Sequence, residues 1–153
     1  MHPVEKKIQE LNLELPPPPK PVGSYTPLVQ SGNLVFISGQ ISRRPDGALL
    51  TGKAGRDLSL EEAREAARFA MLNALSIVGH ALGFDRVARI VRLTGYVQTA
   101  PDFFAIPDVL NGASDLLLAV FGEQGRHARS AVGVAGLPMN AVVEVELTLE
   151  VRP

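Results

Sequence analysis

The sequence predicts an α+β fold in which one mixed sheet carries two helices on one face. Apolar residues recur at helical spacing over residues 60–82 and 101–121, and strand patterns lie before, between and after these segments. The order along the chain is therefore strands, helix, strand, helix and two strands. Two helices can cover only one face of such a sheet. We expect a second copy of the chain to cover the other face.

The N-terminal segment is expected to form a helix followed by a stiff arm. Residues 4–13 place apolar side chains among charges, as a short amphipathic helix does. The prolines at 16–19 cannot continue a helix and favour an extended chain. The predicted organisation is an N-terminal helix and polyproline arm over residues 1–20 and one domain over residues 21–153. The arm would hold the helix away from the domain or lay it across the domain.

The first half of the domain predicts a strand, a hairpin and a long helix. Residues 34–37 are a continuous apolar run of the kind found in buried strands, and residues 43–47 have turn chemistry. Ser59 and Glu62 form a capping box at the start of the long helix. Gly83 is expected to end that helix.

The second half predicts a central strand, the second helix and two final strands. Residues 87–97 have apolar side chains on both faces, which indicates a strand inside the sheet. The helix over 101–121 follows. The final strands, at 127–135 and 143–151, are joined through residues 137–140, where we expect a hairpin turn.

The two final strands predict a ligand site. Arg129 is opposite in parity to Val132, and Glu144 alternates with the apolar residues of the last strand. If both apolar faces meet one core, Arg129 and Glu144 share the other face. Small residues beside the arginine, such as Ala131, leave room for a small ligand. The alternative is a half-solvated hairpin in which arginine and glutamate form a cross-strand pair contributing roughly 0.2 to 1 kcal/mol.

The composition limits the possible functions. At 153 residues the chain fits one domain with a substantial core. Its net charge of −1 gives no overall field that favours nucleic acid or an anionic membrane. The absence of cysteine excludes disulfides, thiolate nucleophiles and cysteine-based metal sites. The chain has no signal-peptide pattern and no apolar run near the roughly 18 residues of a membrane span, so we expect a cytoplasmic protein.

Five short segments carry a family resemblance when they are taken together and in order. They are GSY at 23–25, VFISGQI at 35–41, ARS at 128–130, LP at 137–138 and VEVE at 143–146. The set resembles the Rid family, also called YjgF-like, of reactive-intermediate imine deaminases, which is often labelled endoribonuclease L-PSP. The resemblance implies a chorismate-mutase-like fold, with the open sheet face packed in a homotrimer and clefts between adjacent subunits.

The resemblance also implies roles for site residues. Arg129 would bind a substrate carboxylate, Glu144 would act on the water or on the leaving ammonia, and Tyr25 would reach in from a neighbouring subunit. A guanidinium suits the first role because its parallel N–H groups match a carboxylate. The other implied ligand-binding residues are Ser38, Gly39, Asn111, Ala131 and His127.

Some positions depart from the family pattern, so the chain resembles a divergent, longer member. His127 stands where many members have proline, Ala131 where cysteine is common, and Ser24 where proline is common. On an uninterrupted strand His127 shares the face of Arg129. It is either a second acid–base group or a histidine at the rim of the site or at an interface.

The function implied by the resemblance is hydrolysis of reactive 2-imino or enamine acids to 2-oxoacids and ammonia at an intersubunit cleft, with no metal or organic cofactor. A non-catalytic protein that binds or senses small carboxylates is the alternative, because the same arginine serves both functions. An endoribonuclease is a weaker alternative, because the chain lacks a basic surface interleaved with aromatic residues. We expect a small carboxylate or imino acid as ligand and no membrane partner.

Overall fold

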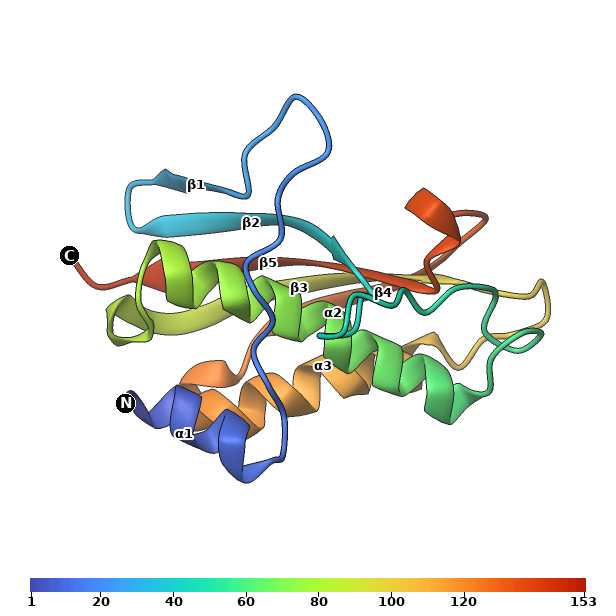
Figure 1. Cartoon of the computed structure of the whole chain (residues 1–153), viewed down its shortest axis with the longest axis horizontal. Helices are drawn as coiled ribbons and strands as arrows, with labels where there is room; N and C mark the ends of the chain where they lie inside the picture. The colour runs from blue at the N-terminus through green and yellow to red at the C-terminus, as the bar shows by residue number, and fades with distance from the viewer.

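The computed structural model describes residues 1–153 and contains one five-stranded sheet in the order β1-β2-β5-β3-β4 (Figure 1). Neighbouring strands are antiparallel, except that β3 and β4 are parallel. The sheet is therefore mixed, which confirms the predicted α+β class. The strands are β1 (Leu28–Ser31), β2 (Leu34–Ile41), β3 (Val87–Gln98), β4 (Ala128–Val134) and β5 (Val143–Val151).

The two long helices lie on the same face of the sheet, as predicted (Figure 1). Helix α2 (Leu60–Ala81) packs on β2 and β5, and α3 (Ile106–Phe121) packs on β3 and β4. The capping box is present at the start of α2. The predicted start of the second helix at residue 101 is wrong, because Pro107 lies in the first turn of α3. Deeper inside a helix, that proline would clash with the preceding turn.

The N-terminal segment is laid across the helices. Helix α1 (Pro3–Glu10) buries Val4 and Ile8 in the common core and contacts α3. The polyproline arm then crosses α2 on its way to β1 (Figure 1). The Ser76 hydroxyl of α2 donates a 2.5 Å hydrogen bond to the Pro16 carbonyl of the arm. Three short 3-10 helices complete the fold: η1 (Phe84–Arg86), η2 (Gly122–Gly125) and η3 (Pro138–Asn140). No helix is both long and apolar enough to cross a lipid bilayer.

The two final strands do not form the predicted hairpin. Strand β3 lies between them and pairs with β4 on one side and with β5 on the other. Leu93 of β3 is opposite Arg129 where β3 pairs with β4, and it is opposite Leu147 where β3 pairs with β5. Because Leu93 and Leu147 are buried under the helices, Arg129 points to the helix side of the sheet.

The prediction that Val132 faces the core is also wrong. Val132 and Glu144 are both opposite Tyr96, so these three side chains share the open face, and Val132 is 42% exposed. The reason is the space under α3. A Cβ added to Gly133 would come within 2.8 Å of the Ile106 side chain, so the helix side of β4 has little room for a larger residue at this position.

The open face is more apolar than a solvent-facing surface requires. In β2, Val35 and Ile37 are buried under the helices, whereas Phe36 is 46% exposed on the other side. The predicted fully buried run over 34–37 is therefore a strand with one buried face. Phe36 and Val132 are thus large apolar side chains left exposed on the open face.

Glycine is required where the two long helices touch. A Cβ at Gly112 would lie 2.0 Å from the backbone oxygen of Arg64. Alanine in a helix interior usually stabilises by about 1 kcal/mol relative to glycine. Here we expect Gly112→Ala to lower the free energy of unfolding by about 1 to 3 kcal/mol, because the helices must move apart. Urea denaturation followed by circular dichroism measures this, and an unchanged or higher midpoint would contradict the close packing.

Candidate functional site

The predicted site residues form two separate groups in the chain. One group, the Arg129 cluster, consists of Arg129 and His127 with Asn111 and Ser114 of α3. The other surrounds a cavity of about 320 Å³, the Glu144 cavity, which includes Tyr25 and Gly39 but no member of the Arg129 cluster.

Arg129 extends from the edge strand β4 toward α3. Its Nη1 donates to Asn111 Oδ1 at 2.8 Å and to Ser114 Oγ at 3.1 Å. Asn111 and Ser114 are three residues apart, so they share one face of α3. Neither Nη2 nor Nε donates to a group of the chain, and no carboxylate lies within salt-bridge distance of the guanidinium. A charged, planar donor edge is thus left for an anion.

His127 belongs to the same hydrogen-bond network. This agrees with the prediction that His127, two residues before Arg129, shares its face. Its Nε2 lies 2.9 Å from Ser114 Oγ, and its Nδ1 lies 2.6 Å from the Gly125 carbonyl oxygen. Ala131, two residues after Arg129, lies on the same face and packs against the core. Ala131 therefore borders the arginine on one side and His127 borders it on the other.

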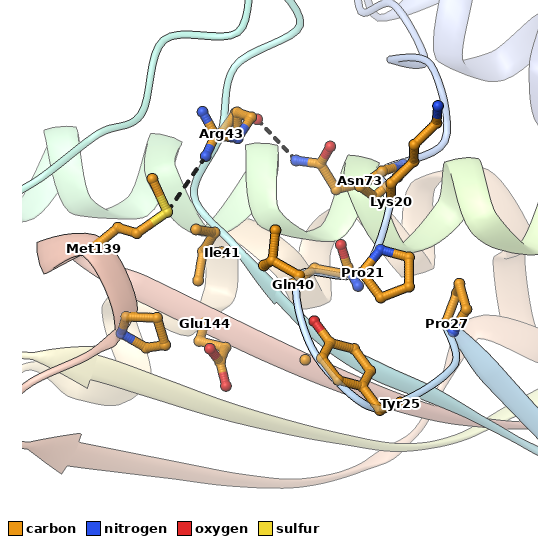
Figure 2. A pocket seen from close by; sticks show the side chains of 14 residues that line it. Lys20, Pro21, Tyr25, Pro27, Gln40, Ile41, Arg43, Asn73, Met139 and Glu144 are labelled. Carbon is orange, nitrogen blue, oxygen red and sulfur yellow. Dashed lines mark hydrogen bonds between the residues drawn. The ribbon is translucent and has the colours of Figure 1, made fainter.

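The Glu144 cavity lies at the start of β5. Its walls come from the polyproline arm, from β2 and from the segment that precedes β5 (Figure 2). Tyr25, in the loop before β1, is 52% exposed and lines the cavity together with Glu144. Pro19, Lys20 and Pro21 of the arm also line it, so the N-terminal segment is part of this group.

Gly39 brings the backbone of β2 against the glutamate. A Cβ at Gly39 would lie 2.7 Å from Glu144 Oε2, so any side chain there would displace the carboxylate. The register between β2 and β5 shifts between Ile37 and Gln40, which places Ser38 and Gly39 in a bulge. Ser38 does not line the cavity. Its hydroxyl donates a 2.6 Å hydrogen bond to the Thr26 carbonyl and ties the Tyr25 loop to β2.

The environment of Glu144 favours its protonated form. Partial burial raises the pKa of this carboxyl above its ordinary value of 4.5, and the nearby charge of Glu146 raises it further. Arg129 does not oppose this shift, because it lies on the other face of the sheet. A carboxyl that holds its proton closer to neutrality is better suited to return that proton to a leaving group.

The raised pKa of Glu144 predicts a pH-dependent stability difference. The native state favours the protonated carboxyl, so the stability from this group is complete below pH 4.5 and is lost as the pH rises through the raised pKa. We therefore expect Glu144→Gln to have a higher thermal midpoint than the wild type at pH 8, and the difference to shrink as the pH falls toward 4.5. Calorimetry at several pH values measures this. A difference that grows on acidification would show that Glu144 is not desolvated.

The prediction that Arg129 and Glu144 share one face is wrong within a single chain. The two side chains leave the sheet on opposite sides, with β3 between their strands. Sequence reasoning also missed Ser114 and the residues of the arm that line the cavity. The three-residue spacing between Asn111 and Ser114 could have identified the serine. No sequence signal placed the arm, because its position depends on how it crosses α2.

No three histidine, aspartate or glutamate side chains converge as a metal site would require. The ligand chemistry of the two groups is that of a guanidinium, an amide, hydroxyls, an imidazole and a carboxyl. Such groups can bind a small carboxylic acid and move a proton without a metal.

Comparison with known proteins matches residues 5–151 to the family described as "YjgF/chorismate mutase-like, putative endoribonuclease". The Trypanosoma cruzi protein named TCP17 is 43% identical over 151 residues, or 97% of this chain and 94% of that protein. A Dermatophagoides farinae protein named 2-iminobutanoate/2-iminopropanoate deaminase is 33% identical over 135 residues, or 88% and 91%. A crystal structure titled as a "putative endoribonuclease" from Shewanella oneidensis has a TM-score of 0.93 at 35% identity, covering 96% of this chain and 98% of that one.

Proposed function

The chain belongs to the YjgF/chorismate mutase-like family, and on that premise we propose that it hydrolyses reactive 2-imino acids to 2-oxoacids and ammonia. The relative named as an iminobutanoate and iminopropanoate deaminase supports this activity. The observation that carries the proposal is the pair of incomplete half-sites. One half offers an unpaired guanidinium edge and the other offers a desolvated carboxyl in a cavity.

We propose that two copies of the chain bring these halves together. Within one chain Arg129 and Glu144 lie on opposite faces of the sheet, so neither half is a complete site. Placing the open face of one copy against the β4 edge of another would join them. The exposed Phe36 and Val132 on the open face provide apolar area for such contact. We expect a homotrimer, with Arg129 from one subunit and Tyr25 and Glu144 from its neighbour at each site.

The chemistry then follows from the side chains. Arg129 binds the substrate carboxylate through two parallel hydrogen bonds and fixes the imine carbon near Glu144. Glu144 takes a proton from water as the water oxygen bonds to the imine carbon. It returns that proton to the nitrogen of the adduct as the carbon–nitrogen bond breaks, and it takes up the remaining hydroxyl proton as the carbonyl forms. A protonated imine and water thus give ammonia, the 2-oxoacid and one proton. The Tyr25 ring forms a wall of the cavity beside the ligand.

A second candidate is a non-catalytic protein that binds small carboxylates. The free edge of Arg129 favours this reading, because carboxylate binding requires only the guanidinium and its supports. The two candidates differ in what Glu144 does. In a binding protein Glu144 transfers no proton, so its replacement by glutamine would leave the affinity for the ligand almost unchanged.

The test is 2-oxoacid release from imino acids generated in the reaction mixture by an amino-acid oxidase. We expect the wild type to accelerate release and Glu144→Gln to be inactive while still binding 2-oxobutanoate. Binding by both proteins without acceleration by either would favour the second candidate. A wild type that neither binds 2-oxobutanoate nor turns over imino acids would refute both candidates. RNA cleavage serves as a counter-assay for the endoribonuclease label, and we expect none above background.

A further inference from the structure

We propose that Ser114 and His127 are positioning residues that orient Arg129 through a one-directional chain of hydrogen bonds starting at the Gly125 carbonyl. This inference rests on the proposed function in one respect: Arg129 is taken as the group that binds the substrate carboxylate. The chain is Gly125 carbonyl, His127 imidazole, Ser114 hydroxyl and Arg129 Nη1, with distances of 2.6, 2.9 and 3.1 Å.

The carbonyl at one end and the guanidinium at the other fix the direction of the two outer links, and we infer the direction of the middle link for the neutral imidazole. A carbonyl oxygen only accepts hydrogen bonds, so Nδ1 of His127 carries a proton and donates it to Gly125. In the neutral imidazole Nε2 is then an acceptor, and the Ser114 hydroxyl donates to it. The Ser114 oxygen keeps lone pairs that accept from Arg129 Nη1. The hydrogen of the Ser114 hydroxyl thus points to His127, and the Ser114 oxygen faces the guanidinium of Arg129.

The backbone holds this network rigidly at both ends. Ser114 is 8% exposed on the inner face of α3. A Cβ at Gly125 would lie 2.3 Å from the Leu117 carbonyl oxygen, so the turn after α3 fits against the helix only with glycine. The acceptor carbonyl of Gly125 and the hydroxyl of Ser114 are therefore both fixed relative to α3.

The network decides which edge of the guanidinium is available. Asn111 and Ser114 together hold Nη1 and no other nitrogen of Arg129. The guanidinium is planar, so fixing Nη1 at two points fixes the direction of the Nη2 and Nε donors. Those two donors form the edge that can bind a carboxylate with two parallel hydrogen bonds. Loss of the serine or the histidine would let the guanidinium rotate and would weaken ligand binding without touching the reacting atoms.

The kinetic test separates binding from chemistry. For Ser114→Ala we expect KM and the dissociation constant for 2-oxobutanoate to rise about tenfold, with kcat within about twofold. For His127→Phe we expect a similar rise. In His127→Gln the side-chain amide can still accept from Ser114, and we expect most of the affinity to return. Loss of kcat without a change in KM, or no change in any of these variants, would overturn the inference.

Two controls match the replaced residues. Ser76, like Ser114, is a buried serine in a helix, but its hydroxyl donates to the Pro16 carbonyl, far from Arg129. Ser76→Ala removes this hydroxyl. His80→Gln replaces an exposed histidine with no hydrogen bond in the structure. We expect both to keep wild-type KM and kcat. A KM rise in Ser76→Ala equal to that in Ser114→Ala would show a general loss of stability and would overturn the positioning role.

A spectroscopic measurement tests the network without relying on activity. The nitrogen-15 shifts of His127 in the wild type, assigned by their loss in His127→Gln, should show the neutral tautomer with the proton on Nδ1. A proton on Nε2 would overturn the proposed direction. If the wild type neither binds 2-oxobutanoate nor turns over imino acids, the proposed function fails. If it does both and the Ser114 and His127 variants match it, only the positioning role fails.

Discussion

Replacing Arg129 by lysine should lower kcat/KM for a 2-imino acid by about tenfold to a hundredfold, mainly through KM. Lysine keeps the positive charge. It cannot present two parallel donors in one plane to a carboxylate. Each hydrogen bond to a charged group contributes about 1.5 to 3 kcal/mol, so losing one of them accounts for a change of this size. Steady-state kinetics and titration with 2-oxobutanoate measure it.

Arg126→Lys is the matched control for this substitution. Arg126 is three residues earlier, exposed, and paired with Glu123 on the surface. Its replacement should change KM and kcat less than about twofold, because exposed ion pairs contribute little. Equal effects of the two lysine substitutions would contradict the assignment of carboxylate binding to Arg129.

Replacing Glu144 by glutamine should lower kcat by about a hundredfold to ten-thousandfold while 2-oxobutanoate still binds. Glutamine has almost the same shape beside Gly39 but cannot accept a proton from water and return it to nitrogen. Glu150→Gln is the control, because Glu150 is on the same strand and face but six residues farther along β5. We expect it to keep wild-type kcat. A fully active Glu144→Gln variant would remove the proton-transfer role.

The pH profile should report the same carboxyl. Glu144 must be ionised to accept a proton from water, so activity should fall on the acid side with a pKa above 4.5. Glu146→Gln removes a neighbouring negative charge that raises the pKa of Glu144. The acid limb of this variant should therefore move to lower pH. A shift to higher pH would mean that another group controls the acid limb.

Local patterns predicted the elements whose neighbours are close in the sequence. The Ser59 and Glu62 capping box located the start of α2 to the residue, because both partners lie in one turn. The alternation from Val143 to Val151 likewise placed the buried face of β5 correctly, because β5 has one side under α2 and one side open. For these elements the pattern and the tertiary environment agree.

The faces of β4 could not be read in the same way. Val132 and Val134 are larger than Ala131 and Gly133, so parity alone suggested that the valines were buried. The close approach of Ile106 of α3 reverses this, since a larger side chain at position 133 would meet it. The insertion of β3 between β4 and β5 is a long-range pairing that no local signal encodes. Both errors had one consequence, which was to place Arg129 and Glu144 on the same side of the sheet.

The corrected geometry changes the expected behaviour of the protein. Arg129 and Glu144 lie on opposite faces of the sheet, so one chain does not bring them together. Under the proposed function Arg129 of one subunit meets Glu144 of another, and activity should depend on assembly. The Arg129 cluster and the Glu144 cavity then make different contributions, and each can be inactivated without disturbing the other.

Mixed oligomers of two inactive variants test this central claim most directly. Arg129→Ala and Glu144→Gln are co-expressed in equal amounts with different tags, and assemblies that carry both tags are purified and assayed. If each site takes its arginine and its glutamate from neighbouring subunits of a trimer, each mixed trimer has one intact site in three, and activity should return to about a third of the wild type. Mixed assemblies as inactive as either variant alone would contradict the shared site.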